Sequence, residues 1–150
     1  MIGLLQRVSQ AKVDVGGATV GQIGPGLLVL LAVEPDDTAA DAEKLVDRVL
    51  RYRVFEDPAG RMNLSLLDTG GGLLLVPQFT LAADTGKGLR PSFTGAAPPE
   101  LGRQLFGHAA SHAGRQIGER LALGQFGAHM QVSLTNDGPV TFWLRAAATT

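Results

Sequence analysis

The sequence holds 150 residues, of which 45% are hydrophobic, and its 13 Lys and Arg against 14 Asp and Glu leave a net charge of −1. This length and composition fit one compact domain, whereas the charge argues against binding along DNA or an RNA duplex, because many phosphate contacts need a basic surplus. The sequence contains no cysteine, which excludes disulfides, thiolate nucleophiles and Cys-based metal sites.

The first part of the sequence predicts strands joined by tight turns. Residues 2–8 and 12–15 are expected strands, and Gly16-Gly17 is a hairpin turn signal that leads into a strand over residues 18–23. Residues 27–33 are apolar on both faces, so we expect them at the centre of the sheet. This longest apolar run is too short to span a membrane, and the N-terminus does not have the plan of a signal peptide. We therefore expect no membrane partner and a cytoplasmic location.

Two helices are expected. The first follows Asp36-Asp37-Thr38, with acidic residues early and arginines late, as the helix dipole favours. Its apolar residues fall at helical spacing and are Ala42, Leu45, Val46, Val49 and Leu50. The second helix follows Pro98-Pro99. It carries His108 and His112 one turn apart, but Ala109 stands where a His-Glu-x-x-His zinc site has its Glu, so we expect no metal and no cofactor.

A candidate site lies where a core strand ends. Residues 73–76 indicate a strand buried on both faces, and Pro77 interrupts it because proline has no N–H for a ladder. Gln78 and Thr80 follow at once, and a long glycine-bearing loop then covers residues 82–93. A rigid strand that delivers polar side chains and free amides to such a loop is a common plan for a site. A plain strand end with a surface loop fits these residues equally.

The C-terminal part predicts a β-hairpin. Residues 130–134 and 140–144 are the expected strands, and Thr135-Asn136-Asp137-Gly138-Pro139 is the expected turn. Nowhere in the sequence do Ser, His and Asp fall into a hydrolase motif such as Gly-x-Ser-x-Gly.

A series of short motifs runs along nearly the whole chain. The motifs are Gln6-Arg7-Val8, Gly24-Pro25-Gly26-Leu27-Leu28-Val29, Phe55-Glu56-Asp57, Met62-Asn63-Leu64-Ser65, Gln78-Phe79-Thr80-Leu81, Ala83-Asp84-Thr85, Lys87-Gly88, Arg90-Pro91-Ser92-Phe93 and Asn136-Asp137-Gly138-Pro139-Val140-Thr141. Together, and in this order, they resemble the D-aminoacyl-tRNA deacylase family.

The resemblance implies a single α/β (α+β) domain, with a mixed, mostly antiparallel, barrel-like sheet and two main helices. It implies a homodimer whose active site lies at the subunit interface and whose other partner is the 3′ end of aminoacyl-tRNA. The implied reaction is hydrolysis of the ester of D-aminoacyl-tRNA, which releases the free D-amino acid and tRNA. This is a chiral proofreading step in translation, and glycine mischarged on tRNA-Ala is a further implied substrate.

The resemblance also implies residue roles. Gln78, Phe79 and Thr80 would form the catalytic segment, in which backbone N–H groups hold the oxyanion and the RNA's own 2′-hydroxyl helps to activate water. Gly138 and Pro139, joined by a cis peptide bond, would reach in from the other subunit and exclude L-amino acids by collision.

Three basic residues complete the expected site. Arg7 is assigned to chiral selection and substrate binding with the Gly-Pro pair. Lys87 and Arg90, beside the site loop, are the expected contacts with tRNA.

One departure from the family leaves alternatives open. Pro77 stands where the family usually has Ser, and a sibling family that removes L-alanine from tRNA carries Pro-Gln-Ala-Thr there. Phe79, Asp137 and Val140 side with the D-specific family. Thr80 could instead be a nucleophile, but the sequence offers it no base. A catalytically silent module that binds the tRNA end is the alternative from another class.

Overall fold

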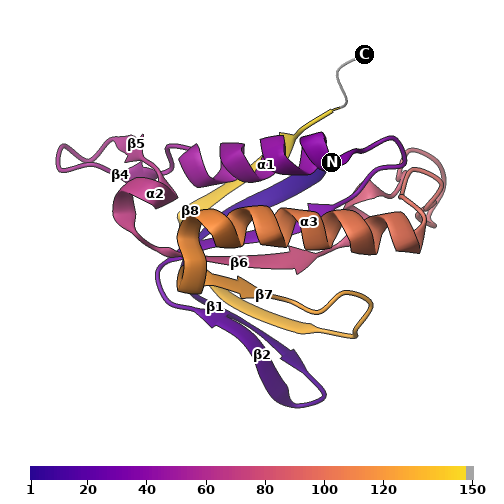
Figure 1. Ribbon diagram of the computed structural model, residues 1–150, viewed down its shortest axis with the longest axis horizontal. Coiled ribbons are helices and arrows are strands. Elements are labelled where there is room, and N and C mark those ends of the chain that lie inside the picture. Colours follow the sequence, from indigo (N-terminus) through magenta and orange to yellow (C-terminus); the bar gives the residue numbers. More distant parts are fainter. Residues whose placement is uncertain (148–150) are drawn as a thin grey trace.

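The computed structural model describes residues 1–147, in which two long helices cover one side of a curved sheet (Figure 1). The sheet strands are β1 (Ile2–Val15), β2 (Ala18–Ile23), β3 (Gly26–Ala32), β6 (Gly72–Pro77), β7 (Leu121–Leu123) and β8 (Gln131–Arg145). The helices are α1 (Ala39–Arg51), the short α2 (Leu66–Thr69), α3 (Pro99–Ile117) and the 3-10 turns η1 (Phe79–Ala82) and η2 (Gly118–Arg120). A separate small hairpin is formed by β4 (Phe55–Glu56) and β5 (Met62–Leu64).

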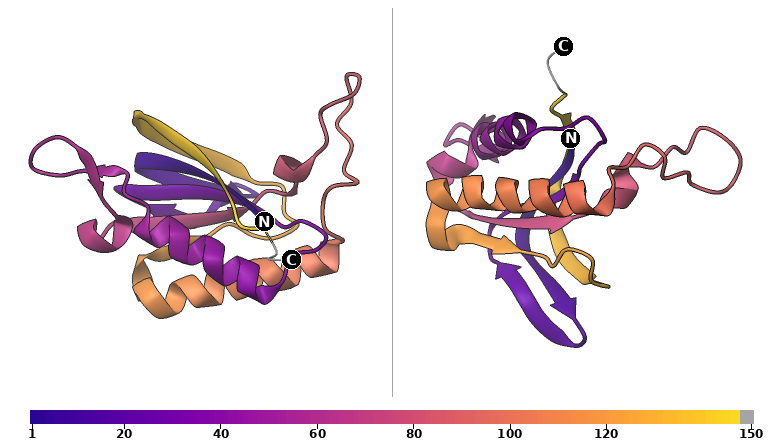
Figure 2. Two further views of the ribbon diagram at one scale, coloured as in Figure 1. Left: turned by 90° about the horizontal axis from the view of Figure 1, so that it is seen from above. Right: turned by 45° about the vertical axis from the view of Figure 1, so that its right-hand side comes forward.

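Strand β1 pairs with three other strands of the sheet. It pairs antiparallel with β2, β3 and β8, while β3 pairs parallel with β6 and β6 pairs parallel with β7. The expected mixed, mostly antiparallel sheet is thus confirmed, and β3 lies between β1 and β6 as its apolar sequence predicted. Among the described residues, α1 and α3 lie on the same side of the sheet, and strands β1 and β2 curl away from them (Figures 1 and 2).

Both faces of β3 and β6 are buried, against two different clusters. Leu27, Val29, Leu31, Leu73 and Leu75 face the helices. The alternate residues of the same strands face a smaller cluster inside the curve of the sheet, namely Leu28, Leu74 and Val76. This alternation follows from the period of two along a strand, and it explains why neither strand shows a polar face in the sequence. Each leucine buried in this way contributes about 1.5–3 kcal/mol.

Helix α1 forms where its periodicity predicted, and the five expected apolar residues are all buried. Its N-terminus is capped by Thr38, whose backbone N–H donates to Asp41 Oδ2 at 2.8 Å. Helix α3 packs beside α1 and supplies Leu105, Phe106 and Ala109 to the same core. Among residues 1–147, no helix is long and apolar enough to cross a membrane.

The two histidines of α3 face carboxylates of α1. His112 Nε2 lies 2.8 Å from Asp47 Oδ1, and Gln116 donates to the same oxygen at 2.9 Å. Burial alone would raise the pKa of the Asp47 carboxyl, but the hydrogen bonds from Gln116 and His112 outweigh it and hold this pKa below its usual value. His108 lies 3.8 Å from Glu43. In the described residues these side chains therefore link the helices, and no group of three or more His, Asp or Glu is arranged to hold a metal ion.

The expected C-terminal hairpin is wrong. Residues 131–145 form one continuous strand, β8, that pairs with β1 along almost its whole length. Between the pairs Gln6–Thr141 and Val8–Asn136, β1 advances two residues while β8 advances five, so the Asn-Asp-Gly-Pro segment is a bulge. The physical reason is that β1 is also one strand, not two, and is long enough to pair with β8 on both sides of the bulge.

Candidate active site

The segment Gln78–Thr80 leaves the sheet at the end of β6. Pro77 is the last ladder residue, opposite Leu31, and the Gln78 N–H then donates to the Leu31 carbonyl at 2.8 Å. The chain turns at once into η1, whose Leu81 N–H donates back to the Gln78 carbonyl at 3.3 Å. The strand end thus fixes where this turn begins, because Gln78 is bonded to both elements.

Two backbone donors at this turn have no partner. Within residues 1–147, the N–H groups of Phe79 and Thr80 donate no hydrogen bond to the protein. The first N–H groups of any helical turn lack an internal acceptor, and here neither a capping side chain nor a neighbouring strand supplies one. Adjacent free amides at a helical N-terminus form a ready site for a negatively charged oxygen.

Gln78 is half-buried, whereas Phe79 and Thr80 are exposed. The Gln78 amide donates to the Thr80 hydroxyl, and this is the hydrogen bond that the structure shows for that hydroxyl. Among the described residues, no His, Asp or Glu bonds to Thr80. The Phe79 ring is 59% exposed and rests against Phe93, with ring centroids 5.3 Å apart.

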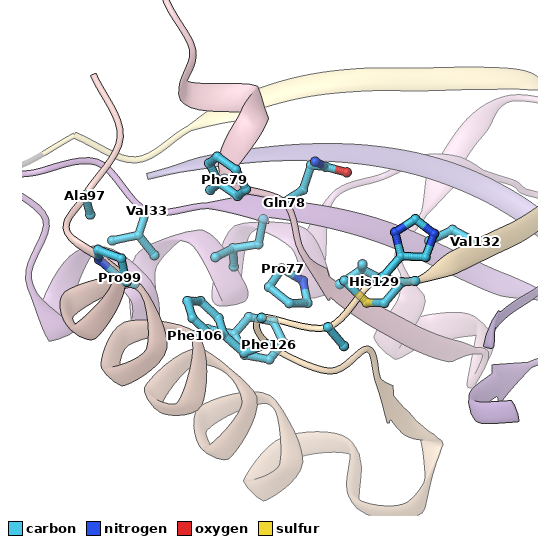
Figure 3. Close-up of a pocket in the computed structure, with 16 residues that line it drawn as sticks. Val33, Pro77, Gln78, Phe79, Ala97, Pro99, Phe106, Phe126, His129 and Val132 are labelled. Atoms are coloured by element: carbon cyan, nitrogen blue, oxygen red, sulfur yellow. The ribbon is translucent and has the colours of Figure 1, made fainter. Parts of the chain in front are cut away.

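A pocket with a volume of about 480 Å³ adjoins Gln78 and Phe79 (Figure 3). Its floor is aromatic, with Phe106 from α3 beside Phe126 from the loop after β7, at a centroid distance of 6.5 Å. His129 and Val132 line the side near β8 in the same view. The sequence analysis missed these wall residues, because they come from three separate elements and no local period marks them.

Gly138 and Pro139 lie in the bulge of β8 and are exposed, and the peptide bond between them is cis, as expected. Arg7 supports this bulge from the inside. Its Nε donates to the Asp137 carbonyl at 3.0 Å and its Nη1 donates to the Val54 carbonyl at 2.8 Å, and its side chain is only 10% exposed. Asn136 frames the other side, where its Oδ1 accepts from the Val140 N–H at 2.9 Å.

The bulge does not meet the pocket within one chain. Gln78 lies beside the Leu31–Gly3 pair, while the bulge lies beside Arg7, which is four residues or about 13 Å further along β1. Strands β3 and β1 also stand between β6 and β8. None of Arg7, Gly138 and Pro139 lines the pocket.

The chain is similar in sequence to a known protein family and to individual relatives. The family model described as D-Tyr-tRNA(Tyr) deacylase matches residues 4–145. The chain belongs to this family. It is 67% identical over 144 residues to a D-aminoacyl-tRNA deacylase of Thioalkalivibrio sulfidiphilus, covering 96% of each chain. It is 63% identical over 145 residues to that of Pseudomonas fluorescens strain Pf0-1, covering 97% of this chain and 99% of the other.

Solved structures carry the same fold. The structure named c-Myc DNA Unwinding Element Binding Protein superimposes with a TM-score of 0.94 at 38% identity, covering 99% of this chain and all of that one. A probable eukaryotic D-amino acid tRNA deacylase superimposes with a TM-score of 0.83 over 95% of this chain and 97% of the other. The latter is 19% identical and shows the fold alone. Membership of the D-Tyr-tRNA(Tyr) deacylase family thus confirms the resemblance inferred from the motifs.

The two basic residues expected to contact tRNA lie on the loop between η1 and α3. Lys87 and Arg90 are both exposed. Neither forms an ion pair with another residue of the described chain.

Proposed function

We propose that this chain hydrolyses the ester bond of D-aminoacyl-tRNA and releases the free D-amino acid and tRNA. The observation that carries the proposal is the pair of unpartnered amides, Phe79 and Thr80, at the mouth of an apolar pocket. Membership of the D-Tyr-tRNA(Tyr) deacylase family and relatives named D-aminoacyl-tRNA deacylase support it. The proposed place of action is the cytoplasm, where tRNA is charged and used.

In the proposed reaction the two amides hold the ester carbonyl oxygen as it becomes an oxyanion. Water attacks the carbonyl carbon, the bond to the ribose oxygen breaks, and that oxygen leaves on the tRNA with a proton while the amino acid leaves as a carboxylate. The 2′-hydroxyl of the terminal ribose assists the attacking water. Each amide of such a site is worth about 3 kcal/mol in the transition state. An ester is reactive enough that no protein nucleophile is needed.

The pocket beside Gln78 is proposed to hold the terminal adenosine. Its aromatic floor of Phe106 and Phe126 suits a flat base, and its volume of about 480 Å³ is within the usual range for a small ligand. The base is common to all charged tRNAs, whereas the amino-acid side chain varies. A pocket that encloses the adenine base leaves the amino-acid side chain outside, so different D-amino acids can be accepted.

Chiral selection is proposed to need a second copy of the chain. The bulge with Gly138 and Pro139 is exposed and lies apart from its own pocket, so a homodimer in which each bulge lies beside the other subunit's Gln78–Thr80 segment, outside the pocket for the adenosine, would complete both sites. The side chain of an L-amino acid would then collide with the bulge backbone. A D-amino acid, or glycine mischarged on tRNA-Ala, would fit.

The test is hydrolysis of three esters by the same protein: D-Tyr-tRNA, L-Tyr-tRNA and L-Ala-tRNA. Rapid loss of D-Tyr-tRNA with L-Tyr-tRNA intact is expected. Pro77 favours one competing function, because the sibling family that edits L-alanine also has proline there. Preferred hydrolysis of L-Ala-tRNA would establish that function instead. Binding of all three without turnover would establish a silent tRNA-end module.

Thr80→Ala is expected to keep substantial activity. The change removes a hydroxyl that, in residues 1–147, is bonded to the Gln78 side chain, and it leaves both amides in place. The cost should be that of one hydrogen bond, roughly 0.5–1.5 kcal/mol or at most about tenfold in rate. Single-turnover hydrolysis of D-Tyr-tRNA measures it. A loss of several orders of magnitude would identify Thr80 as the nucleophile.

Chelation is expected to leave the activity unchanged. The proposed chemistry uses amide donors and RNA, and neither histidine of α3 lines the pocket beside Gln78. Hydrolysis of D-Tyr-tRNA should proceed at the same rate after dialysis against EDTA as before. A rate that falls in EDTA and returns with zinc would refute this.

A further inference from the structure

A nine-residue arm, residues 84–92, projects from the body of the protein just after the catalytic segment (Figure 2). Its base is closed by two backbone hydrogen bonds, from the Asp84 N–H to the Ser92 carbonyl at 2.7 Å and from the Ser92 N–H to the Asp84 carbonyl at 2.9 Å. The arm is therefore a loop that is closed at its root, where Asp84 and Ser92 pair.

The tip of the arm is basic and apolar at once. Lys87 and Arg90 flank Leu89, whose side chain is fully exposed at 104% of its reference area. The arm's one carboxylate, Asp84, accepts from the Gly86 N–H at 2.8 Å at the root, so it does not neutralise the tip. In a chain of net charge −1, two unpaired cations around a wholly exposed leucine form an unusual local surface.

The root of the arm is joined to the catalytic segment. Directly beyond Ser92, the Phe93 ring packs against the Phe79 ring. Residues 84–92 begin two residues after η1 ends, so the root of the arm lies beside the turn that carries the free amides of Phe79 and Thr80. With about four residues in each leg, the tip can reach roughly 13 Å from its root.

We propose that the arm grips the single-stranded 3′ end of the tRNA upstream of the terminal adenosine. Leu89 packs against the face of an unstacked base, and Lys87 and Arg90 pair with the phosphates on either side of it. Single-stranded RNA offers both an apolar base face and regularly spaced negative charge, which matches this tip. The inference rests on the proposed function, and it adds a strand-binding element, with Leu89 at its centre, to that site.

The test compares two substrates that differ only in the RNA strand. One is D-Tyr-tRNA, and the other is D-tyrosyl-adenosine, an ester with no phosphate and no upstream nucleotide. Leu89→Ser and the double variant Lys87→Ala/Arg90→Ala are expected to lower kcat/KM for D-Tyr-tRNA by about tenfold or more. Both should stay within about twofold of the unaltered protein on D-tyrosyl-adenosine.

The salt dependence gives a second readout. Removing both cations should flatten the plot of log(kcat/KM) for D-Tyr-tRNA against log[salt] by roughly 1.4 units, since each phosphate contact on a single strand contributes about 0.7. Leu89→Ser should lower the activity without changing that slope. Val20→Ser is the matched control, because Val20 is also an exposed aliphatic residue but lies on β2, away from the arm. It should change neither kcat/KM for D-Tyr-tRNA nor the salt slope.

Three results would overturn the inference. Equal losses on both substrates would mean that the arm acts through Phe79 on the chemistry, and no loss on either would mean that it does not touch RNA. Arm variants that become monomeric by light scattering would make it an interface between copies of the chain. If the unaltered protein hydrolyses neither ester, the proposed function itself fails, which is a different outcome from intact activity that is insensitive to the arm.

Discussion

Gly138→Val is expected to abolish hydrolysis of D-Tyr-tRNA. Gly138 has φ +138°, a conformation that residues with side chains rarely adopt. A Cβ placed there would lie 2.7 Å from Val140 Cγ2, 3.1 Å from Arg7 Nη2 and 3.1 Å from the Val140 backbone nitrogen. A β-branched side chain must therefore distort the bulge. In the proposed dimer it also fills the space that the substrate's own backbone needs.

We expect a loss of at least about a thousandfold, which corresponds to roughly 4 kcal/mol of transition-state binding. Single-turnover hydrolysis of D-Tyr-tRNA measures it. Gly16→Val is the matched control, because Gly16 also has positive φ, +56°, but nothing lies within 4 Å of its added Cβ. Thermal melting and light scattering show whether each variant is folded and dimeric. A folded, dimeric Gly138→Val protein with ordinary activity would contradict the proposed role of the bulge.

Arg7→Met is expected to cost both stability and chiral discrimination. Methionine fills much of the same space but donates nothing, so the carbonyls of Val54 and Asp137 lose their donors inside the protein. Leaving two acceptors without partners should lower the free energy of unfolding by about 3 kcal/mol. The bulge that carries Gly138 also loses its inner support. We expect the rate with D-Tyr-tRNA to fall by about a hundredfold, or close to 3 kcal/mol.

The informative measurement for Arg7 is the ratio of D-Tyr-tRNA to L-Tyr-tRNA hydrolysis. A bulge that is no longer held in place should exclude L-amino acids less well, so the ratio should fall, which a purely structural role would not cause. Arg7→Lys keeps the charge but cannot form both hydrogen bonds in the same geometry, and an intermediate effect is expected. Arg61→Met, in the exposed turn between β4 and β5, controls for the loss of an arginine. An unchanged ratio in Arg7→Met would separate Arg7 from selection.

Local sequence patterns predicted those elements whose formation depends little on which other elements they pack against. Helix α1 could be read from five apolar residues at helical spacing, because burying that stripe is favourable against almost any core. Strands β3 and β6 could be read as central, because a run of aliphatic residues with no polar face must be covered on both sides. The candidate segment at Gln78 was predicted for a related reason, since a proline marks the end of such a strand, although Gln78 still bonds to Leu31 and the free amides come one residue later.

The sequence by itself determined the family, the core strands, helix α1 and the residues placed at the end of β6. Tertiary structure alone decided that residues 131–145 form one bulged strand, since a turn signal such as Asn-Asp-Gly-Pro is a local preference and the pairing that overrides it comes from β1, more than a hundred residues earlier. It also decided that Phe106 and Phe126 meet beneath Gln78, and that Gly138 lies away from that pocket. A pocket depends on which elements pack together, and the energy that brings them together is spread over the whole core, so no single stretch of sequence records it.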